Sequence, residues 1–343
     1  MGGTGPFPSD ALRDFLDSTF GPATGVAFER VAGGQSNPTY FVTHGKERMV
    51  LRKQPAGPIL RGAHAIDREF RILRALHPAG LPVPRPILFH ADPALLGTPF
   101  YLMERVDGRV FADAALPGQS PSERREIWMA LSDAMAALHA VRPEEVGLDD
   151  LGRPGNYFAR QIARWTAQWQ AADSGQIPEL DRLAEWLPAN LPPEDGERRI
   201  AHGDFRMGNM LFHPGEPRVV AILDWELATI GHPLADLGFC CIAWHSTADE
   251  YGGLLGRDLA AEGLPEQAGF VARYMARRPG CGPLLPFHIA FALFRFAVIF
   301  VGIAERARQG SAASTDAAAL APLARRFAIR GCGIIDRPGR TSA

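Results

Sequence analysis

One segment in the second half of the chain gathers the residue types that phosphate chemistry requires. It runs from Ile200 to Asp224 and reads I-A-H-G-D-F-R-M-G-N-M-L-F-H-P-G-E-P-R-V-V-A-I-L-D. Short strands are expected at Met210 to Phe212 and at Val219 to Leu223, on either side of a Pro/Gly turn. Antiparallel pairing of these strands would set Asn209 opposite Asp224.

This spacing predicts a magnesium site next to a carboxylate. Magnesium prefers oxygen ligands and usually takes only one or two of them from the protein. Asn209 and Asp224 supply two such oxygens, and Asp204 lies one short loop away. A carboxylate that accepts or orients a hydroxyl proton, together with a metal that neutralises phosphate charge, is what phosphoryl transfer needs. The alternative is a turn and a strand cap, but the order and spacing of all three residues favour the catalytic interpretation.

The segment resembles the catalytic loop and metal strand of the aminoglycoside phosphotransferase and choline kinase superfamily, which shares the protein-kinase fold. His202 to Asn209 matches the kinase catalytic loop in length. The resemblance implies that Asp204 is the catalytic base and that Arg206 lies near the transferred phosphate. It further implies that Asn209 and Asp224 bind Mg²⁺ and that ATP is the phosphate donor.

The elements that must position these residues predict an α+β, two-lobed, protein-kinase-like fold. Three strand patterns alternate with turns and predict an antiparallel meander at Val26 to Val31, Thr39 to Thr43 and Met49 to Lys53. A helical pattern then runs to Leu76, and two further extended runs end at Val106. The segment up to residue 106 is therefore interpreted as an N-terminal, nucleotide-binding lobe with an antiparallel sheet.

Strand patterns become scarce after Val106, and the rest of the chain is expected to be mainly helical. Amphipathic helices are predicted at Ser122 to Ala140, Tyr157 to Gln170 and Glu179 to Leu187. Residues 107–343 are accordingly interpreted as a C-terminal catalytic and substrate-binding lobe.

The resemblance places nucleotide-binding residues in the first lobe. Gly34, Ser36 and Asn37 belong to the turn between the first two strands, where a kinase has its phosphate-covering loop. This turn is neither a G-x-G-x-x-G nor a Walker motif. Glu104 and Val106 lie at the end of the last strand of this lobe, where it runs into the hinge, and the resemblance implies that their main-chain groups bind adenine.

Arg52 is expected to take the place of the phosphate-binding lysine of kinases. Strand alternation sends Arg52 to one face and Lys53 to the other. A branched residue two positions before the cation resembles the kinase V-A-I-K strand. Lys53 stays an alternative because strand registers slip easily by one residue. Glu69 on the following helix is the expected partner of Arg52, and a solvated glutamate without a partner is the alternative.

Other segments narrow the resemblance. Gly155 to Trp165 and Phe294 to Arg306 look like the branch that includes the kinase-like domains of acyl-CoA dehydrogenase family members ten and eleven. The similarity spans nearly the whole chain. Asp236 lies after the metal strand, and the resemblance implies that it braces the catalytic loop.

The charge of the C-terminal region favours an anionic phosphate acceptor. From Cys240 onward the chain has twelve arginines against eight acidic residues, which is the wrong sign for a polycation. His288 and Arg295 share one face of an apolar helix. We expect Arg295, together with His288, to receive an anionic group of a hydroxylated metabolite, such as a hydroxy acid or its acyl thioester.

Arg160 or Arg164, from an earlier helix, is expected to assist Arg295. The alternative for Arg295 is a structural ion pair, with Asp236 or Glu305 as its partner.

Three other functions compete with this interpretation. An aminoglycoside or amino-alcohol kinase fits the superfamily but not the local charge. A protein kinase is disfavoured because the short connection from Asp224 to Asp236 has no Ala-Pro-Glu segment. A non-catalytic nucleotide-binding module is a further alternative, because a fold alone does not prove activity. The joint presence of Asp204, Asn209 and Asp224 argues against it. The sequence does not decide between ATP and GTP as the phosphate donor, and it does not give the oligomeric state.

Composition narrows the partners and the compartment. The chain has 343 residues, with 36 Lys and Arg against 38 Asp and Glu, so no global field favours nucleic acid or an anionic membrane. A small-molecule substrate is the expected partner. The four cysteines lack metal-ligand spacing and no secretory signal is recognised, which favours a cytoplasmic protein. The apolar run from Phe287 to Ala304 carries His288 and Arg295, so we expect a buried core helix.

Overall fold

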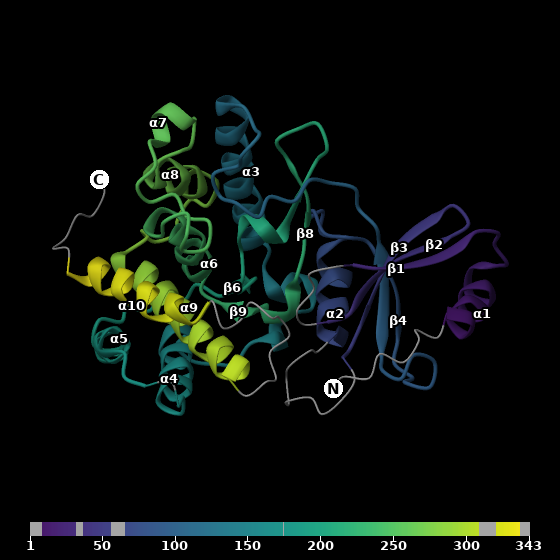
Figure 1. Cartoon of the computed structure of the whole chain (residues 1–343), viewed down its shortest axis with the longest axis horizontal. Coiled ribbons are helices and arrows are strands. Elements are labelled where there is room, and N and C mark those ends of the chain that lie inside the picture. The colour runs from purple at the N-terminus through teal and green to yellow at the C-terminus, as the bar shows by residue number, and fades with distance from the viewer. Residues whose placement is uncertain (1–8, 32–36, 56–65, 174, 309–319, 337–343) are drawn as a thin grey trace. The chain divides into compact units, whose positions relative to one another are not determined.

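The computed structural model describes residues 9–31, 37–55, 66–173, 175–308 and 320–336 (Figure 1). The described chain divides into two compact units. The first contains the residues up to Asp107 together with Ala221–Glu226, and the second contains Gly108–Val220 and the residues from Leu227 onward. Gly34 and Ser36, both predicted to contact the nucleotide, lie outside the described residues.

An antiparallel sheet forms the frame of the first unit, as the strand patterns predicted. Its strand order is β1-β2-β3-β5-β4. The strands are β1 (Val26–Arg30), β2 (Thr39–His44), β3 (Glu47–Lys53), β4 (Pro86–His90) and β5 (Phe100–Glu104). The register sets Arg52 of β3 opposite Tyr101 of β5, so these two side chains share one face of the sheet.

Two helices accompany this sheet. Helix α1 (Ser9–Phe20) buries Leu12 and Leu16 in a core with Leu51 and Leu102 from the sheet. Helix α1 was not predicted from the sequence, although its buried leucines stand four residues apart, which is a helical spacing. Helix α2 (Ile66–Leu76) packs against β4 and β5 and carries Glu69.

Helices make up most of the second unit, and the three that were predicted there are confirmed. Helices α3 and α8 pack together, and α9 packs against α4, α5, α6 and α10. Figure 1 shows α9 and α10 side by side. The helices are α3 (Pro121–Ala140), α4 (Tyr157–Gln170), α5 (Pro178–Ala189), α6 (Pro233–Cys240), α7 (Leu259–Glu262), α8 (Gln267–Arg277), α9 (Pro286–Arg308) and α10 (Ala321–Ile335).

Helix α9 is the apolar helix that the sequence singled out. By length and composition it is the one helix in the described residues that could cross a membrane, yet 83% of its most apolar stretch is buried inside the protein. The prediction of a buried core helix is therefore confirmed.

Short strands frame the predicted catalytic loop. Strand β6 (Arg199–Ala201) pairs with β9 (Thr229–Gly231), with Arg199 opposite Gly231 and Ala201 opposite Thr229. Strands β7 (Met210–Phe212) and β8 (Val219–Ile222) form the second pair, as predicted. The loop 202–209 thus leaves the C-terminal end of β6 and enters β7.

Candidate active site

The loop 202–209 depends on a glycine for its path. Gly203 has φ of 84°, which is the left-handed region that L side chains rarely adopt. A Cβ atom at Gly203 would lie 2.7 Å from the carbonyl oxygen of Leu227. Both facts explain why a glycine precedes Asp204, and both fix the direction in which the loop presents that carboxylate.

The loop brings three of the predicted site residues together. The Asn209 side chain donates from Nδ2 to Asp204 Oδ2 at 2.7 Å and to the Asp204 carbonyl oxygen at 2.8 Å. Arg206 donates from Nε to Asp204 Oδ2 at 3.3 Å. The Asp204 carboxylate is partly exposed, so it is held in place and still open to a ligand. Such a pre-positioned carboxylate beside a guanidinium suits proton acceptance next to a phosphate.

Asp236 braces this loop from α6. Its carboxylate accepts hydrogen bonds from His202 N at 2.6 Å and from Gly203 N at 2.9 Å. It also contacts His139 Nε2 at 3.2 Å, while His139 Nδ1 lies 2.7 Å from the Tyr274 hydroxyl. The bracing that the resemblance implied is therefore present in the structure.

Ionisation of this buried pair follows from its environment. Burial raises the pKa of Asp236, but the hydrogen bonds from His139 and Gly203 outweigh it, and the net pKa is lowered. Burial lowers the pKa of His139. A neutral His139 therefore donates to an ionised Asp236 and accepts from Tyr274. Sequence reasoning missed His139 and Tyr274, because their link to the loop runs through contacts between distant helices.

Arg295 supports the same loop, which corrects its predicted role. Only 5% of Arg295 is exposed, and its Nη2 donates to the carbonyl oxygen of Gly203. Its guanidinium also lies 5.9 Å from the ring of Trp165 and 5.1 Å from that of Phe239. A cation enclosed in this way stabilises the loop and is not available to an acceptor. The structural alternative is the better one, although the partner is a carbonyl oxygen rather than Asp236 or Glu305.

In the first unit, Arg52 of β3 pairs with Glu69 of α2. Arg52 Nε lies 3.3 Å from Glu69 Oε2. Glu69 is 1% exposed, and it accepts further hydrogen bonds from Tyr101 Oη at 3.0 Å and Asn37 Nδ2 at 2.8 Å. Lys53 points elsewhere, because its Nζ donates to the carbonyl oxygen of Leu96 at 2.7 Å. The predicted pair is therefore present, and the alternative of a solvated Glu69 is wrong.

Arg52 keeps its charge although it is largely buried. Burial alone lowers the pKa of Arg52, but the carboxylates of Glu69 and Asp224 outweigh this effect, and the net pKa is raised. Burial raises the pKa of Glu69, while Arg52, Tyr101 and Asn37 each favour its ionised form. These bonds hold the guanidinium in one position, as a residue that binds phosphate requires.

Asp224 also lies in the first unit and has an unusual backbone. Its φ of 66° is uncommon for a residue with a side chain, and such conformations cluster at functional sites. Asp224 Oδ1 accepts from Arg52 Nη2 at 3.2 Å. Because Asn209 belongs to the second unit, the predicted placement of Asn209 opposite Asp224 stays a prediction.

The two predicted magnesium ligands offer suitable donor atoms. Asp224 presents a carboxylate that is about one-third exposed. Among the residues that the structure describes, the Asn209 side chain makes its two hydrogen bonds through the amide nitrogen, so the amide oxygen is open to a cation. Carboxylate and amide oxygens are the ligands that magnesium prefers, so both residues fit this metal.

The segment after β5 was predicted to bind adenine through its backbone. The N–H of Glu104 donates to the Arg85 carbonyl oxygen at 2.9 Å, so this N–H is already occupied. The carbonyl group of Glu104 is the main-chain group left for a ligand. Arg105 N–H donates to the Arg48 carbonyl oxygen at 3.1 Å. Val106 makes no backbone hydrogen bond within the part of the chain that the structure describes. Its two main-chain groups are therefore available to a ligand.

The remaining predicted acceptor residues do not gather at the loop. Arg160 and His288 line a cavity of about 380 Å³ whose lining includes no residue from 202–209. Arg164 is exposed, with its guanidinium 5.1 Å from the Trp165 ring. The prediction that these residues act together with Arg295 at one acceptor site is therefore wrong.

A smaller cavity of about 70 Å³ does adjoin the loop. Its walls include Arg206 and Met207 from the loop and the aromatic side chains of Trp128, Phe239 and Tyr251. Arg206 is its only charged lining residue among those described, and its guanidinium lies 5.6 Å from the Tyr251 ring. These walls could not be predicted from the sequence, because their aromatic residues come from distant segments.

Comparison with known proteins decides the family. The sequence model described as "Phosphotransferase enzyme family" matches residues 27–277. The chain belongs to this family. It is therefore a small-molecule kinase, and the predicted membership is confirmed.

Individual relatives agree with this assignment. The chain is 39% identical over 316 residues to acyl-CoA dehydrogenase family member 10 of Mus musculus, covering 90% of this chain but only 29% of that protein. A crystal structure from Ralstonia eutropha JMP134, provisionally named an aminoglycoside phosphotransferase, is 40% identical with a TM-score of 0.86, covering 96% of this chain and 98% of that one. The chain thus spans less than a third of the first relative and nearly all of the second.

A distant structure confirms the fold. Aminoglycoside phosphotransferase APH(4)-Ia, solved as a ternary complex with AMP-PNP and hygromycin B, has a TM-score of 0.62 at 17% identity, covering 94% of this chain and 99% of that one. Together with the five-stranded antiparallel sheet and the many helices, this likeness confirms the predicted α+β, kinase-like fold.

Proposed function

We propose that the chain transfers the γ-phosphoryl group of ATP, with Mg²⁺, to a hydroxyl group of a small anionic metabolite such as a hydroxy acid or a hydroxyacyl thioester. The observation that carries the proposal is the hydrogen-bonded cluster of Asp204, Arg206 and Asn209 on a braced loop. APH(4)-Ia was solved with the ATP analogue AMP-PNP, and this chain shares its fold. That likeness supports ATP as the donor.

Each residue of the cluster has one task in this proposal. Asp204 orients the acceptor hydroxyl and accepts its proton, because its carboxylate is held by Asn209 and remains partly exposed. Arg206 offsets the negative charge of the transferred group. Asn209 and Asp224 would hold the magnesium, which neutralises phosphate charge when it is bound.

The first unit supplies the nucleotide contacts. Arg52, held by Glu69, binds phosphate oxygens, and Asn37 keeps Glu69 in position. The main chain of Glu104 and Val106 binds the adenine. Gly34 and Ser36 are proposed to cover the phosphates, as the resemblance implied.

The cavity beside the loop supports an anionic, partly apolar acceptor. Aromatic walls suit a short hydrocarbon segment, and Arg206 is the charged group that faces it among the described residues. An aminoglycoside or an amino alcohol is a cation and would need carboxylates in this position. The candidate acceptors are therefore hydroxy acids and their thioesters, in which a carboxylate or a phosphate group accompanies the hydroxyl.

A substrate panel tests the acceptor. ADP release is to be measured with 3-hydroxybutyrate, 4-hydroxybutyrate and their CoA thioesters, and in parallel with kanamycin and choline. We expect turnover with at least one of the anionic acceptors. Turnover with kanamycin or choline alone would favour the aminoglycoside or amino-alcohol kinase, and ATP binding without turnover on any alcohol would favour a non-catalytic nucleotide-binding module.

Arg206→Met tests the charge of the acceptor pocket. Loss of a charge-assisted contact should raise the KM for the anionic acceptor about tenfold or more, besides any fall in kcat. Arg218→Met is the matched control, because Arg218 is an exposed arginine that pairs with the nearby Glu216. An unchanged KM in Arg206→Met would show that Arg206 does not bind the acceptor.

The assignment of Arg52 rather than Lys53 is tested by nucleotide affinity. Arg52→Lys should weaken AMP-PNP binding about tenfold, because lysine cannot reproduce the forked contact of a guanidinium with phosphate. Lys53→Met should change this affinity less than about twofold, since Lys53 Nζ bonds the Leu96 carbonyl on the other face of the sheet. Calorimetric titration measures both constants, and the reverse order of effects would contradict the assignment.

A further inference from the structure

A cavity of the second unit, away from the catalytic loop, has no part in the proposed reaction. It has a volume of about 380 Å³ and lies between the start of α4, the segment 192–198, the end of β9 and the start of α9. This volume lies within the range of small-molecule binding sites. Its walls are partly apolar, with Phe158, Leu234 and Leu285 among them.

The cavity and the catalytic loop lie at opposite ends of β6. Arg198, which lines the cavity, precedes β6, whereas the loop begins at His202 after it. Gly231, also in the lining, pairs with the first residue of β6, while the last residue of β6 pairs with Thr229. Three strand residues span about 10 Å, so a ligand in this cavity would not touch the loop residues.

One buried side chain of the lining, His288, carries a hydrogen-bond donor. His288 is 2% exposed, and its Nδ1 accepts a hydrogen bond from Leu285 N at 2.9 Å. Burial, with the neighbouring His232, lowers the pKa of His288 to about 3, so the ring is neutral and carries its proton on Nε2. The Nε2–H group of His288 is therefore a hydrogen-bond donor at the wall of the cavity.

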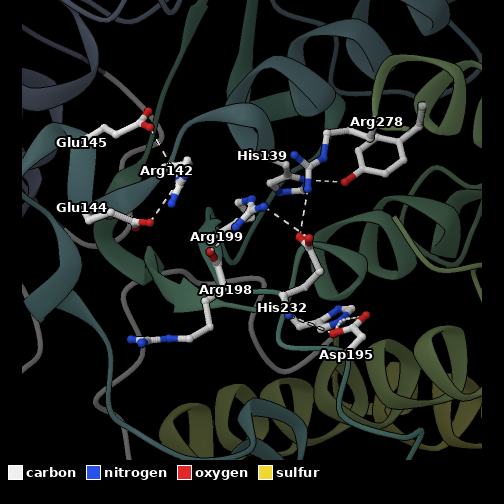
Figure 2. Close-up of polar contacts among 11 residues, drawn as sticks. His139, Arg142, Glu144, Glu145, Asp195, Arg198, Arg199, His232 and Arg278 are labelled. Atoms are coloured by element: carbon white, nitrogen blue, oxygen red, sulfur yellow. Dashed lines mark hydrogen bonds and ion pairs between the residues drawn. The ribbon is translucent and has the colours of Figure 1, made fainter. Parts of the chain in front are cut away.

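Two acidic residues of the lining have side-chain partners. Asp195 pairs with His232 at 3.1 Å, and Figure 2 shows the two side chains together. Glu197 accepts from Arg199 Nη2 at 3.2 Å and from Arg278 Nη2 at 2.9 Å. Glu194 is the remaining acid of the lining.

The arginines at the rim of the cavity have fewer partners than the acidic residues. Arg153 and Arg198 are exposed, and the described residues provide no partner for either guanidinium. Figure 2 shows the Arg198 side chain lying apart from the paired groups. Arg160 donates from Nη1 to the carbonyl oxygen of Pro154 at 2.8 Å and to that of Gly155, and its positive charge also faces the cavity. Among the described lining residues that have no ion-pair partner, three are arginines and one is an acid, Glu194, so the excess charge is positive.

We propose that this cavity is a second binding site, separate from the acceptor pocket, for a small organic anion that carries a carboxylate or a phosphate group on an apolar body. Arg153 and Arg198 bind the anionic group at the rim, because guanidinium groups match the oxygens of carboxylate and phosphate. The His288 N–H supplies an additional donor, and the apolar walls enclose the rest of the ligand.

Titration of phenyl phosphate and of benzoate into the full chain tests the site, with Mg²⁺ and AMP-PNP present to fill the nucleotide site. At least one of the two anions should bind with a Kd below about 1 mM, whereas benzylamine, a cation of similar size, should not bind. The two anions together show whether the site prefers a phosphate or a carboxylate. Binding of neither anion up to about 10 mM, or tighter binding of benzylamine, would overturn the proposal.

Variants then locate the bound probe. Arg198→Glu and Arg153→Glu should each weaken binding about tenfold, and His288→Phe should weaken it severalfold while it keeps an aromatic ring in place. Arg125→Glu is the matched control, since Arg125 is an exposed arginine of α3 outside the lining, and it should leave the Kd within about twofold. Loss of binding in Arg206→Met instead of in the rim variants would place the probe at the catalytic loop and refute the second site.

Discussion

An Asp204→Asn variant is expected to lose about 10²- to 10⁴-fold in kcat while it binds AMP-PNP as tightly as the wild-type chain. The asparagine keeps the shape of the side chain, and its carbonyl oxygen can still accept from Asn209 Nδ2, so the loop should keep its path. The basic carboxylate is lost, and with it the group that accepts the hydroxyl proton. Because this interaction is made chiefly in the transition state, the loss appears in kcat rather than in nucleotide affinity.

Two measurements separate this catalytic role from a structural one. The thermal midpoint of Asp204→Asn should stay close to that of the wild type, because the carboxylate is partly exposed. Asp336→Asn is the control, since Asp336 is an exposed carboxylate of the second unit that also pairs with an arginine, Arg182. Its kcat should stay within about twofold of the wild-type value. A folded Asp204→Asn variant with near-normal kcat would refute the assignment of Asp204 as the base.

The parts of the site that the sequence predicted are those fixed by local geometry. Asp204, Arg206 and Asn209 lie in one eight-residue loop, so their mutual contacts depend on a short stretch of backbone. The pairing of Arg52 with Glu69 followed from strand alternation, which decides the face of a side chain, and from a helix that packs on that face.

The parts that the sequence could not predict depend on packing between distant helices. Arg295 was recognised as unusual because it is an arginine in an apolar helix, but its partner is the Gly203 carbonyl oxygen. A backbone carbonyl has no sequence pattern, so only ionic partners were considered for Arg295. The link from His139 and Tyr274 to the loop, which runs through Asp236, could not be predicted for a similar reason. The three residues lie on three different helices.

The predicted acceptor residues show most clearly this limit of prediction from the sequence. Net charge along the sequence favoured an anionic acceptor, but it does not identify which arginine faces which cavity. Arg160 and His288 line the larger cavity, whereas Arg206 of the loop faces the smaller one. Assignment of a charged residue to a ligand therefore required the three-dimensional arrangement of α4, α9 and the loop.

Replacement of Asp236 should give the largest loss of stability among the variants considered. In Asp236→Ala the buried N–H groups of His202 and Gly203 lose their acceptor, and so does the ring of His139. Removing one partner from a buried charged network costs about 3 to 5 kcal/mol. We expect the free energy of unfolding to fall by that amount, measured by urea denaturation followed by circular dichroism. Activity should fall as well, because the loop that carries Asp204 loses its brace.

Two further variants distinguish the contribution of the buried network from that of an ordinary ion pair. Asp133 is the matched control, since its carboxylate accepts two hydrogen bonds from Arg273 but is about one-third exposed, so Asp133→Ala should cost about 1 kcal/mol or less. Asp236→Asn keeps the volume of the side chain but turns one acceptor atom into a donor that faces an N–H group. It should therefore also be destabilised, although less than Asp236→Ala, because one acceptor remains. A loss in Asp236→Ala no greater than that in Asp133→Ala would show that Asp236 does not hold the catalytic loop.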